Sequence, residues 1–538
     1  MTRLKILTWL AATVGLAPHA YSAPQSCEAL AKTELGHATV TSAESVAAGA
    51  FAPPAGLPVW MTGDPAFFKT VSAFCRVKVT SKPTPDSEIK IEVWLPASEW
   101  NGKFRGQGNG GFAGQIDYRA LAVAVRQGYA TAATDTGHEA DGTDASWALG
   151  HPEKIVDFGH RAIHEMTVVG KATTKAFYGD AVKRAYFANC SNGGRQALME
   201  AQKYPEDYDG ILAGAPANYW THLLASALWD AQATTSDPAS YIPSSKVAVI
   251  ANAVLAACDA KDGVKDGIIG DPRKCDFDAA VLECKSGESD SCLTAPQVKA
   301  LKKLYEGAHD SKGKPVFPGF VVGGETGPGG WPLWITGGKP TDGLLFAFGY
   351  GYFADMVYGK KDWDYKMQNL DEAVVASDQK FANVLNAVQS DMKTFEAHGG
   401  KLIIYHGWAD AAISPLNAIN YYESVVQKMG KAESDAFLRL YMVPGMQHCG
   451  SGPGPDDFGE FGFSQIRDTR HDVYLALEEW VEKGTPPPDA LIASKHEGMG
   501  PTGKVTMTRP VCAFPQEAKY QGSGDTNDAA NFVCAAGK

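Results

Sequence analysis

Apolar and polar residues follow two alternating patterns along the chain. Short runs rich in apolar and β-branched residues predict strands at residues 88–96, 129–137, 184–190, 210–216, 401–407 and 437–445. Longer segments, in which apolar residues recur every three or four positions, predict helices at residues 158–179, 415–430 and 472–484. Strands that alternate with helices indicate an α/β domain with a mostly parallel sheet.

This alternation lapses between residues 217 and 395. The stretch is rich in Gly, Pro and aromatic residues, and it contains four of the ten cysteines. We therefore predict an insertion held by disulfides, which divides the main domain into residues 24–216 and 396–538. A chain of 538 residues is long enough for such an arrangement.

The first 23 residues have the layout of a secretory signal. Arg3 and Lys5 precede an apolar run from residue 6 to residue 17, and small residues follow up to Ser22 and Ala23. The run is shorter than the roughly 20 apolar residues of a membrane span, and no later stretch approaches that length. We expect residues 1–23 to be removed and the mature protein to be secreted or periplasmic, with no membrane partner.

Charge and cysteine content narrow the class further. The net charge of −12 comes from 49 basic and 61 acidic residues without a basic arm, which argues against nucleic acid as a partner. An even number of cysteines in an exported protein predicts five disulfides. Spacing alone leaves their pairing open.

The segment from residue 184 to residue 200 predicts a strand, a sharp turn and a helix, with Ser191 at the turn. This is the setting of the nucleophile elbow of α/β-hydrolases, whose usual motif is G-x-S-x-G. Asn189 replaces the first glycine here, while Gly193 supplies the second, so the match is partial. The alternative is a serine that caps the following helix.

An acid and a base are expected after the nucleophile in chain order. Asp410 follows a predicted strand end, and His448 lies in a glycine-rich loop after the next strand. Asp135 and His406 are further candidates, but His406 precedes the acid, and we expect it to be a satisfied or substrate-facing histidine instead.

Two cysteines flank these candidates. Cys190 precedes Ser191 and Cys449 follows His448, so a bridge between them would hold the nucleophile against its base. In the alternative, Cys190 is itself a thiolate nucleophile with His448 as its base, which the even cysteine count of an exported protein disfavours.

The pairs Cys190-Ser191 and His448-Cys449, with Asp410 between them, resemble the CS-D-HC signature of the tannase and feruloyl esterase family. The resemblance covers nearly the whole mature chain. It implies an α/β-hydrolase fold with a large lid inserted between nucleophile and acid. It also implies a carboxylic ester hydrolase that works through an acyl-enzyme.

The family resemblance assigns roles to individual residues. It implies Ser191 as nucleophile, His448 as general base and acid, and Asp410 as the residue that orients the histidine. The glycine-rich segment 100–114 resembles the glycine loop of the family, which implies that Gly111 and Asn192 form the oxyanion hole. Without the other residues, such a run would be a plain glycine turn.

The resemblance also implies a disulfide pattern and a metal. The implied pairs are Cys27–Cys75, Cys190–Cys449, Cys258–Cys275, Cys284–Cys292 and Cys512–Cys534. In the loop between Cys258 and Cys275, three carboxylates suit Ca²⁺, although by itself the loop would be an ordinary acidic surface loop. The family implies a structural Ca²⁺ in the lid, bound by the side chains of Asp259, Asp262 and Asp266 and the carbonyls of Val264 and Ile268.

The lid aromatics suggest a flat acyl group. They are Trp331, Trp334, Phe348, Tyr350, Tyr352 and Phe353, although such a run is more often lid core than pocket. The family implies a small aromatic ester of the gallate or hydroxycinnamate type, free or linked to a plant polymer. We expect His406, Ile413, Trp334 and Phe348 to contact it.

Two alternatives remain for the function. The family includes a hydrolase of mono(2-hydroxyethyl) terephthalate, but Leu344 stands where that enzyme has a carboxylate-binding arginine and Ile413 where it has an aromatic residue, which disfavours this half-ester. The other alternative is a calcium-stabilised protein that binds aromatic ligands without turnover.

Overall fold

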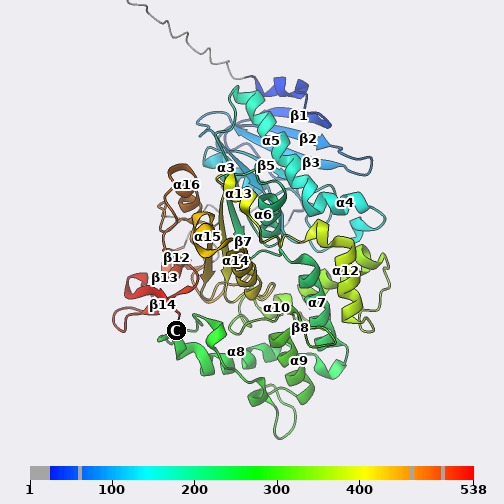
Figure 1. Cartoon of the computed structure of the whole chain (residues 1–538), viewed down its shortest axis with the longest axis vertical. Helices are drawn as coiled ribbons and strands as arrows, with labels where there is room; N and C mark the ends of the chain where they lie inside the picture. The colour runs from blue at the N-terminus through cyan, green and yellow to red at the C-terminus, as the bar shows by residue number, and fades with distance from the viewer. Residues whose placement is uncertain (1–24, 58–63, 461–463, 465, 499–502, 538) are drawn as a thin grey trace, which may run out of the picture.

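A nine-stranded sheet forms the centre of the computed structural model, which describes residues 25–57, 64–460, 464, 466–498 and 503–537 (Figure 1). The predicted signal segment lies outside the described residues. Along the sheet the order is β1-β2-β3-β5-β4-β6-β7-β10-β11. Their bounds are Ala38–Val46 (β1), Phe74–Ser81 (β2), Ile89–Pro96 (β3), Lys103–Gln107 (β4), Ala130–Thr134 (β5), Arg184–Cys190 (β6), Gly210–Gly214 (β7), Lys401–Gly407 (β10) and Leu438–Val443 (β11).

The sheet has an antiparallel and a parallel part. Strands β1, β2, β3 and β5 pair antiparallel in that order, whereas β5, β4, β6, β7, β10 and β11 run parallel. Parallel neighbours need long crossovers, which the helices between the strands supply. The prediction of a mostly parallel α/β sheet is therefore confirmed.

Helices cover both faces of the sheet. In β10, Leu402 and Ile404 belong to the core under α5 (Ala162–Tyr178), α6 (Asn192–Lys203) and α14 (Leu416–Met429). Ile403 and Tyr405, which alternate with them, belong to the opposite core under α3 (Tyr118–Arg126) and α16 (Val473–Lys483). This alternation is the period-2 geometry of a strand that is buried on both sides. Shorter elements of the main domain are η1 (Cys27–Lys32), α2 (Pro65–Phe68), η2 (Ser146–Ala148), α4 (Pro152–Val156), η3 (Asp157–Arg161), α15 (Lys431–Phe437) and η9 (Ala529–Asn531).

The chain between β7 and β10 forms a largely helical layer at one end of the molecule (Figure 1). Its aromatic core joins the main domain, because Phe353 and Trp220 of this layer share a cluster with Phe112 and Phe158. The elements are α7 (Trp220–Thr235), η4 (Pro238–Ser240), α8 (Ser244–Cys258), η5 (Asp259–Asp262), η6 (Pro272–Lys274), η7 (Ala279–Leu282), α9 (Ala295–Glu306), β8 (Gly307–His309), β9 (Pro315–Pro318), α10 (Trp331–Trp334), α11 (Leu344–Gly351), η8 (Tyr352–Tyr358), α12 (Leu370–Leu385) and α13 (Lys393–Ala397). Phe395 of α13 already packs in the core of the main sheet.

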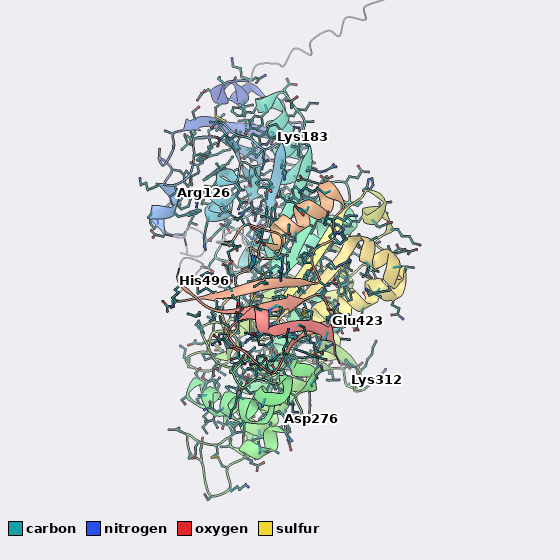
Figure 2. All side chains as sticks on the ribbon, turned by 90° about the vertical axis from the view of Figure 1, so that its left-hand side faces the viewer. Arg126, Lys183, Asp276, Lys312, Glu423 and His496 are labelled. Carbon is teal, nitrogen blue, oxygen red and sulfur yellow. A yellow bond between two sulfur atoms is a disulfide. The ribbon has the colours of Figure 1, made fainter. Side chains whose placement is uncertain are left out.

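Two hairpins end the chain, and they lie between the sheet and the inserted layer in Figure 2. They are β12 (Ala490–His496) with β13 (Val505–Cys512), and β14 (Gln516–Tyr520) with β15 (Phe532–Ala536). Arg509 of β13 reaches Asp266 of the inserted layer with a 2.6 Å ion pair, so the hairpins connect the two parts. Within the described residues, no helix is both long and apolar enough to cross a membrane.

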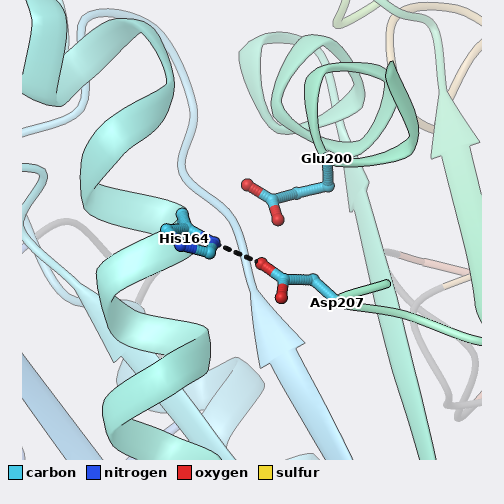
Figure 3. A group of neighbouring side chains, drawn as sticks. All are labelled: His164, Glu200 and Asp207. Carbon is cyan, nitrogen blue, oxygen red and sulfur yellow. Dashed lines mark hydrogen bonds and ion pairs between the residues drawn. The ribbon is translucent and has the colours of Figure 1, made fainter. Parts of the chain in front are cut away.

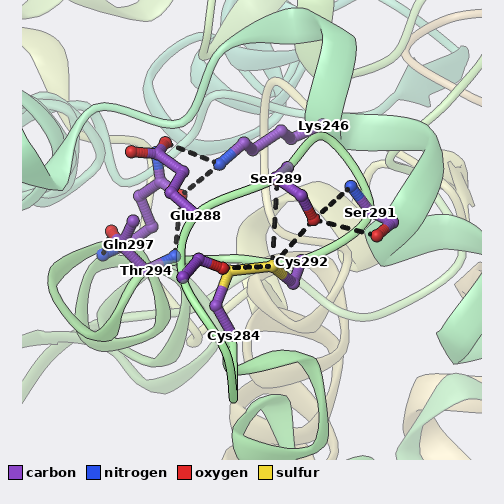
Figure 4. Close-up of a disulfide and its surroundings, with 9 residues drawn as sticks. Lys246, Cys284, Glu288, Ser289, Ser291, Cys292, Thr294 and Gln297 are labelled. Carbon is purple, nitrogen blue, oxygen red and sulfur yellow. Dashed lines mark hydrogen bonds and ion pairs between the residues drawn. A yellow bond between two sulfur atoms is a disulfide. The ribbon is translucent and has the colours of Figure 1, made fainter.

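All ten cysteines are paired. The bridges are Cys27–Cys75, Cys190–Cys449, Cys258–Cys275, Cys284–Cys292 and Cys512–Cys534, which is the pattern that the family resemblance implies. Beside Cys284–Cys292, the buried Lys246 donates to Glu288 at 2.9 Å and to Gln297 at 3.2 Å (Figure 4). The disulfide loop is thus anchored to α8 and α9.

Candidate active site

Ser191 occupies the sharp turn between β6 and α6. Its backbone has φ 65° and ψ −125°, a conformation that a non-glycine residue adopts only under constraint. The Ser191 N–H donates to the carbonyl of Gly214 at 2.9 Å, which fixes the turn to β7. The hydroxyl makes no capping bond to α6, so the alternative of a helix-capping serine is wrong.

The residues around Ser191 explain the partial motif. A Cβ on Gly193 would come within 2.1 Å of Asn189 Oδ1, so the asparagine side chain occupies the space beside this glycine. Asn189 Oδ1 also accepts the Cys190 N–H at 2.8 Å. An asparagine is therefore accommodated at the first glycine position of the motif because the second position keeps its glycine.

Asp410 and His448 meet Ser191 in one hydrogen-bonded chain. A carboxylate only accepts hydrogen bonds, so His448 Nδ1–H donates to Asp410 Oδ2, at 2.8 Å. The other ring nitrogen, Nε2, then accepts from Ser191 Oγ, at 2.9 Å. Ser191 and Asp410 are 219 positions apart in the sequence, and Asp410 and His448 are 38 positions apart, yet His448 contacts both of the other side chains.

Asp410 is fully buried yet stays ionised. Burial by itself would raise the pKa of its carboxyl, but the charge of His448 and the hydrogen bonds from His406 and His448 hold the pKa well below the ordinary value of 3.8. Its second oxygen accepts the N–H groups of Ala412 and Ile413 at 2.8 and 3.0 Å. The carboxylate can therefore orient His448 and stabilise the imidazolium that forms when the histidine takes a proton.

Of the two roles expected for His406, the structure shows the satisfied, hydrogen-bonded one. It is fully buried behind Asp410, and its Nε2–H donates to Asp410 Oδ2 at 3.0 Å and to the Ile413 carbonyl at 3.1 Å. The prediction that His406 contacts the substrate is wrong, because the ring faces the carboxylate and not the cavity described below. His406 is a second imidazole on the same carboxylate oxygen.

We expect His406→Ala to lower kcat about tenfold with little change in KM, because a charge-assisted hydrogen bond to the orienting carboxylate is lost. His406→Gln, whose amide N–H can replace Nε2–H, should retain most of the activity. Steady-state kinetics on both variants check this. A loss confined to KM would contradict a positioning role.

The disulfide Cys190–Cys449 lies directly beside the hydrogen-bonded side chains. Its Cα atoms are 5.9 Å apart, and it joins positions separated by 259 residues. Since both sulfur atoms are bonded, the alternative of a Cys190 thiolate nucleophile is wrong. The bridge instead connects the residue before Ser191 with the residue after His448.

Gly111 and Asn192, the predicted oxyanion hole, both line a cavity beside Ser191. Gly111 has φ 55°, and a Cβ there would come within 2.3 Å of the Gly142 carbonyl, so the position requires glycine. Asn192 is held by its side chain, whose Oδ1 accepts from Arg195 Nε at 2.8 Å.

Arg195 is a residue that sequence reasoning missed. It is fully buried, and its guanidinium donates to the carbonyls of Gly159 at 2.7 Å and Phe158 at 3.0 Å. Burial lowers the pKa of Arg195 to about 9, which leaves it charged at neutral pH. Its position one helical turn after Asn192, directly behind two glycines, was the available signal.

The cavity has a volume of about 80 Å³ and a mostly apolar wall. Among the described residues, the wall contains no Lys, Arg, Asp or Glu. Trp334 lies 5.0 Å from the His448 ring in an edge contact and stacks with Phe348 at 6.4 Å. The full wall consists of Gly111, Ser191, Asn192, Ala217, Trp220, Leu223, Leu224, Ala227, Trp334, Leu345, Phe348, Ala412, Ile413 and His448.

Some of the residues predicted to contact the substrate line this cavity, and others lie elsewhere. Trp334, Phe348 and Ile413 line the cavity. The other lid aromatics do not, since Trp331, Tyr352 and Phe353 are buried in lid cores and Tyr350 donates to the Lys361 carbonyl. Leu345 lines the cavity, whereas Leu344, the position compared with an arginine, is outside its wall. The missed residues are mainly those of α7, for which only an apolar stretch after a strand end gave a signal.

The acidic lid loop brings its three carboxylates close to backbone amides. Asp259 Oδ1 accepts from Gly267 N–H at 3.0 Å, and Asp262 from the N–H groups of Val264 and Gly270, each at 3.0 Å. Burial, followed by the charges of Asp266 and Asp259, raises the pKa of Asp262 to about 6. The Asp266–Arg509 ion pair is a partner that the sequence did not predict.

The sheet, the elbow and the inserted helical layer define an esterase of the α/β-hydrolase type, and the comparisons with known proteins agree. The family model "Tannase and feruloyl esterase" matches residues 75–535, and the chain belongs to this family. The protein is thus a carboxylic ester hydrolase.

Relatives with named activities cover almost the whole chain. An uncharacterized esterase of Xanthomonas campestris pv. campestris is 40% identical, over 99% of this chain and 95% of the relative. A probable feruloyl esterase B of Aspergillus clavatus is 32% identical, over 99% and 100%. The crystal structure of feruloyl esterase B from Aspergillus oryzae has a TM-score of 0.85 at 30% identity, over 95% of this chain and 99% of that chain.

Proposed function

We propose that this protein is a serine esterase that hydrolyses neutral esters of aromatic acids, of the hydroxycinnamate or gallate type. The observation that carries the proposal is the Ser191–His448–Asp410 hydrogen-bonded chain, which opens on an aromatic cavity with an uncharged wall. The substrate is a small ester, free or linked to a plant polymer. The feruloyl esterase names of the relatives support this substrate class.

The mechanism follows from the contacts. Ser191 Oγ attacks the ester carbonyl carbon while its proton passes to His448 Nε2, and the charge of Asp410 stabilises the resulting imidazolium. Backbone N–H groups at Gly111 and Asn192 would hold the oxyanion. When the C–O bond breaks, the imidazolium returns the proton to the leaving alcohol. Water then attacks the acyl-enzyme while His448 takes its proton. When the acyl–Oγ bond breaks and the acid leaves, His448 returns this proton to Ser191 Oγ.

We expect a fluorophosphonate probe to label the protein at Ser191, and hydrolysis of methyl ferulate, methyl caffeate and methyl gallate to exceed that of the terephthalate half-ester. The reason is that a free carboxylate would lose hydration in a wall without a cation. Product release by chromatography measures the order. A half-ester preferred over all three would overturn the substrate class while leaving the labelling intact.

A matched pair of variants tests the wall directly. Leu345→Arg places a guanidinium at a position that lines the cavity, and should shift preference toward the half-ester. Leu344→Arg, one residue away and outside the wall, is the control and should leave the order unchanged. Absence of both labelling and turnover would instead favour a protein that binds aromatic ligands without chemistry.

We further propose export after removal of residues 1–23, and a structural Ca²⁺ in the lid loop. Five disulfides support export.

The Ca²⁺ site is supported by hard oxygen donors, the carboxylates of Asp259, Asp262 and Asp266 with carbonyls of Val264 and Ile268. Burial, and next the like charges of Asp266 and Asp259, raise the pKa of Asp262, and a bound divalent cation would offset both effects. The ion would hold the loop and take no part in the reaction.

Removal of Ca²⁺ with a chelator is expected to lower the melting temperature by about 5 °C, since a ligand bound only to the folded state stabilises it by mass action. Adding Ca²⁺ should restore it. Asp262→Asn should abolish the response, and Asp290→Asn, at an exposed aspartate elsewhere in the lid, should not. Differential scanning calorimetry measures the shift, and a melting temperature insensitive to Ca²⁺ would contradict the proposal.

A further inference from the structure

A histidine and two carboxylates converge on the face of the main domain formed by α5 and α6 (Figure 3). His164 comes from α5, Glu200 from α6, and Asp207 from the loop that leads into β7. His164 Nδ1 lies 2.6 Å from Asp207 Oδ2. One candidate ligand atom from each of the three residues lies within 4.8 Å of the others.

Glu200 is the unusual member of the group. Its side chain is 1% exposed and points toward His164 and Asp207, and among the described residues neither of its oxygens has a hydrogen-bond partner. A buried carboxylate without a donor is costly unless a proton or a cation compensates it. Burial, and next the charge of Asp207, raise the pKa of Glu200 well above its ordinary value of 4.5. The buried Glu200 carboxylate therefore lacks a compensating partner, which a bound cation would supply.

Neighbouring residues hold His164 and Asp207 in place. The His164 ring stacks on Tyr204 at 4.0 Å, and the Tyr204 hydroxyl bonds to His160 Nδ1 at 2.7 Å. The ammonium group of Lys171 donates to the backbone carbonyl of Asp207, and the Asp207 carboxylate is in contact with His164. The side chain of His164 is 32% exposed, which gives an ion access from solvent.

We propose that His164, Glu200 and Asp207 form a binding site for Zn²⁺ that is separate from the lid loop and from the catalytic residues. One imidazole nitrogen and two carboxylate oxygens are a donor set suited to this borderline ion, with water completing the coordination from the exposed side. On binding, Glu200 loses its proton to the buffer. A neutral His164, two carboxylates and Zn²⁺ then sum to zero charge, which removes the cost of the buried acid.

The position of the site indicates its effect. Glu200 lies nine residues after Ser191 on the same helix, about 13 Å along its axis, so the ion would not touch the substrate. It would cross-link α5 to the helix that begins at the nucleophile. Zinc should therefore stabilise the main domain and leave the chemical step unchanged.

The test is isothermal titration calorimetry of the chelator-treated mature protein with ZnCl₂ in saturating Ca²⁺. We expect one zinc ion per chain, release of about one proton per ion when buffers of different ionisation enthalpy are compared, and a rise in melting temperature of about 2 to 3 °C at 100 times Kd. Co²⁺ in place of zinc should give visible d–d absorption at the same stoichiometry.

Three variants locate the site. Glu200→Gln and His164→Gln should each weaken zinc binding about 100-fold or more. His37→Gln should leave zinc binding unchanged. His37 lies 2.6 Å from Glu165, which is in α5 beside His164, but neither residue belongs to the group of three ligands. Activity and melting temperature without zinc confirm that each variant is folded.

Either of two results would overturn the proposal. One is the absence of a one-to-one zinc site in the unmodified protein. If the melting temperature of Glu200→Gln is then unchanged or raised, Glu200 and Asp207 share a proton instead of binding an ion. The other is zinc binding that survives in both Glu200→Gln and His164→Gln, which would place the ion elsewhere.

Discussion

Replacing Ser191 by alanine is expected to lower kcat on methyl ferulate by about 10⁴-fold or more. The hydroxyl is the atom that attacks, and its contact is with His448 Nε2 at 2.9 Å, so no other side chain on the cavity wall can substitute for it. Because the hydroxyl makes no capping bond, the variant should keep the fold and melt near the unmodified protein. Steady-state kinetics measures kcat, and calorimetry measures the melting temperature.

The matched comparison for this variant is His448→Ala, alone and combined with Ser191→Ala. Residues that act as one unit lose activity together, so the double variant should be no slower than the slower single variant. Losses that multiply would mean that the two side chains act independently. Retention of more than about one hundredth of the activity in Ser191→Ala would contradict a serine nucleophile altogether.

The sheet could be predicted from the sequence only where local pattern decides the structure. All six predicted strands correspond to β3, β5, β6, β7, β10 and β11, whose inner positions are apolar on one or both sides. Strands β1, β2 and β4 of the sheet were not predicted, and in β4 the charged residues look exposed. Lys103 instead pairs with Glu478 at 2.8 Å, and Arg105 lies 4.4 Å over the Tyr474 ring. Both partners are more than 350 positions away, where no local pattern reaches.

The same limit applies to the site. Chain order and the adjacent cysteines were enough to select Ser191, Asp410 and His448, because these features repeat a known arrangement. The roles of His406 and Arg195 depend on which buried acceptor each one faces, and this is settled by packing. The His164–Asp207 contact spans 43 positions without a motif, so only the fold brings the proposed zinc ligands together.

Replacing Cys190 and Cys449 together by alanine is expected to lower both stability and kcat. Opening a loop of 259 residues removes up to about 5 kcal/mol in the chain-entropy treatment, and we expect a fall in melting temperature of roughly 5 °C. The bridge also sets the distance between the residues on either side of the Ser191–His448 contact. Displacement by about 1 Å should lower kcat on the order of 100-fold, with a smaller effect on KM.

The control is the double replacement of Cys284 and Cys292 by alanine. That disulfide closes a loop of only eight residues in the lid, away from the cavity wall, so its loss should lower the melting temperature less and leave kcat unchanged. Kinetics below the melting temperature of each variant separate the two effects of the Cys190–Cys449 bridge. If the variant without Cys190 and Cys449 is destabilised but keeps full kcat, this bridge serves only the stability of the fold, because the sheet alone then suffices to hold Ser191 against His448.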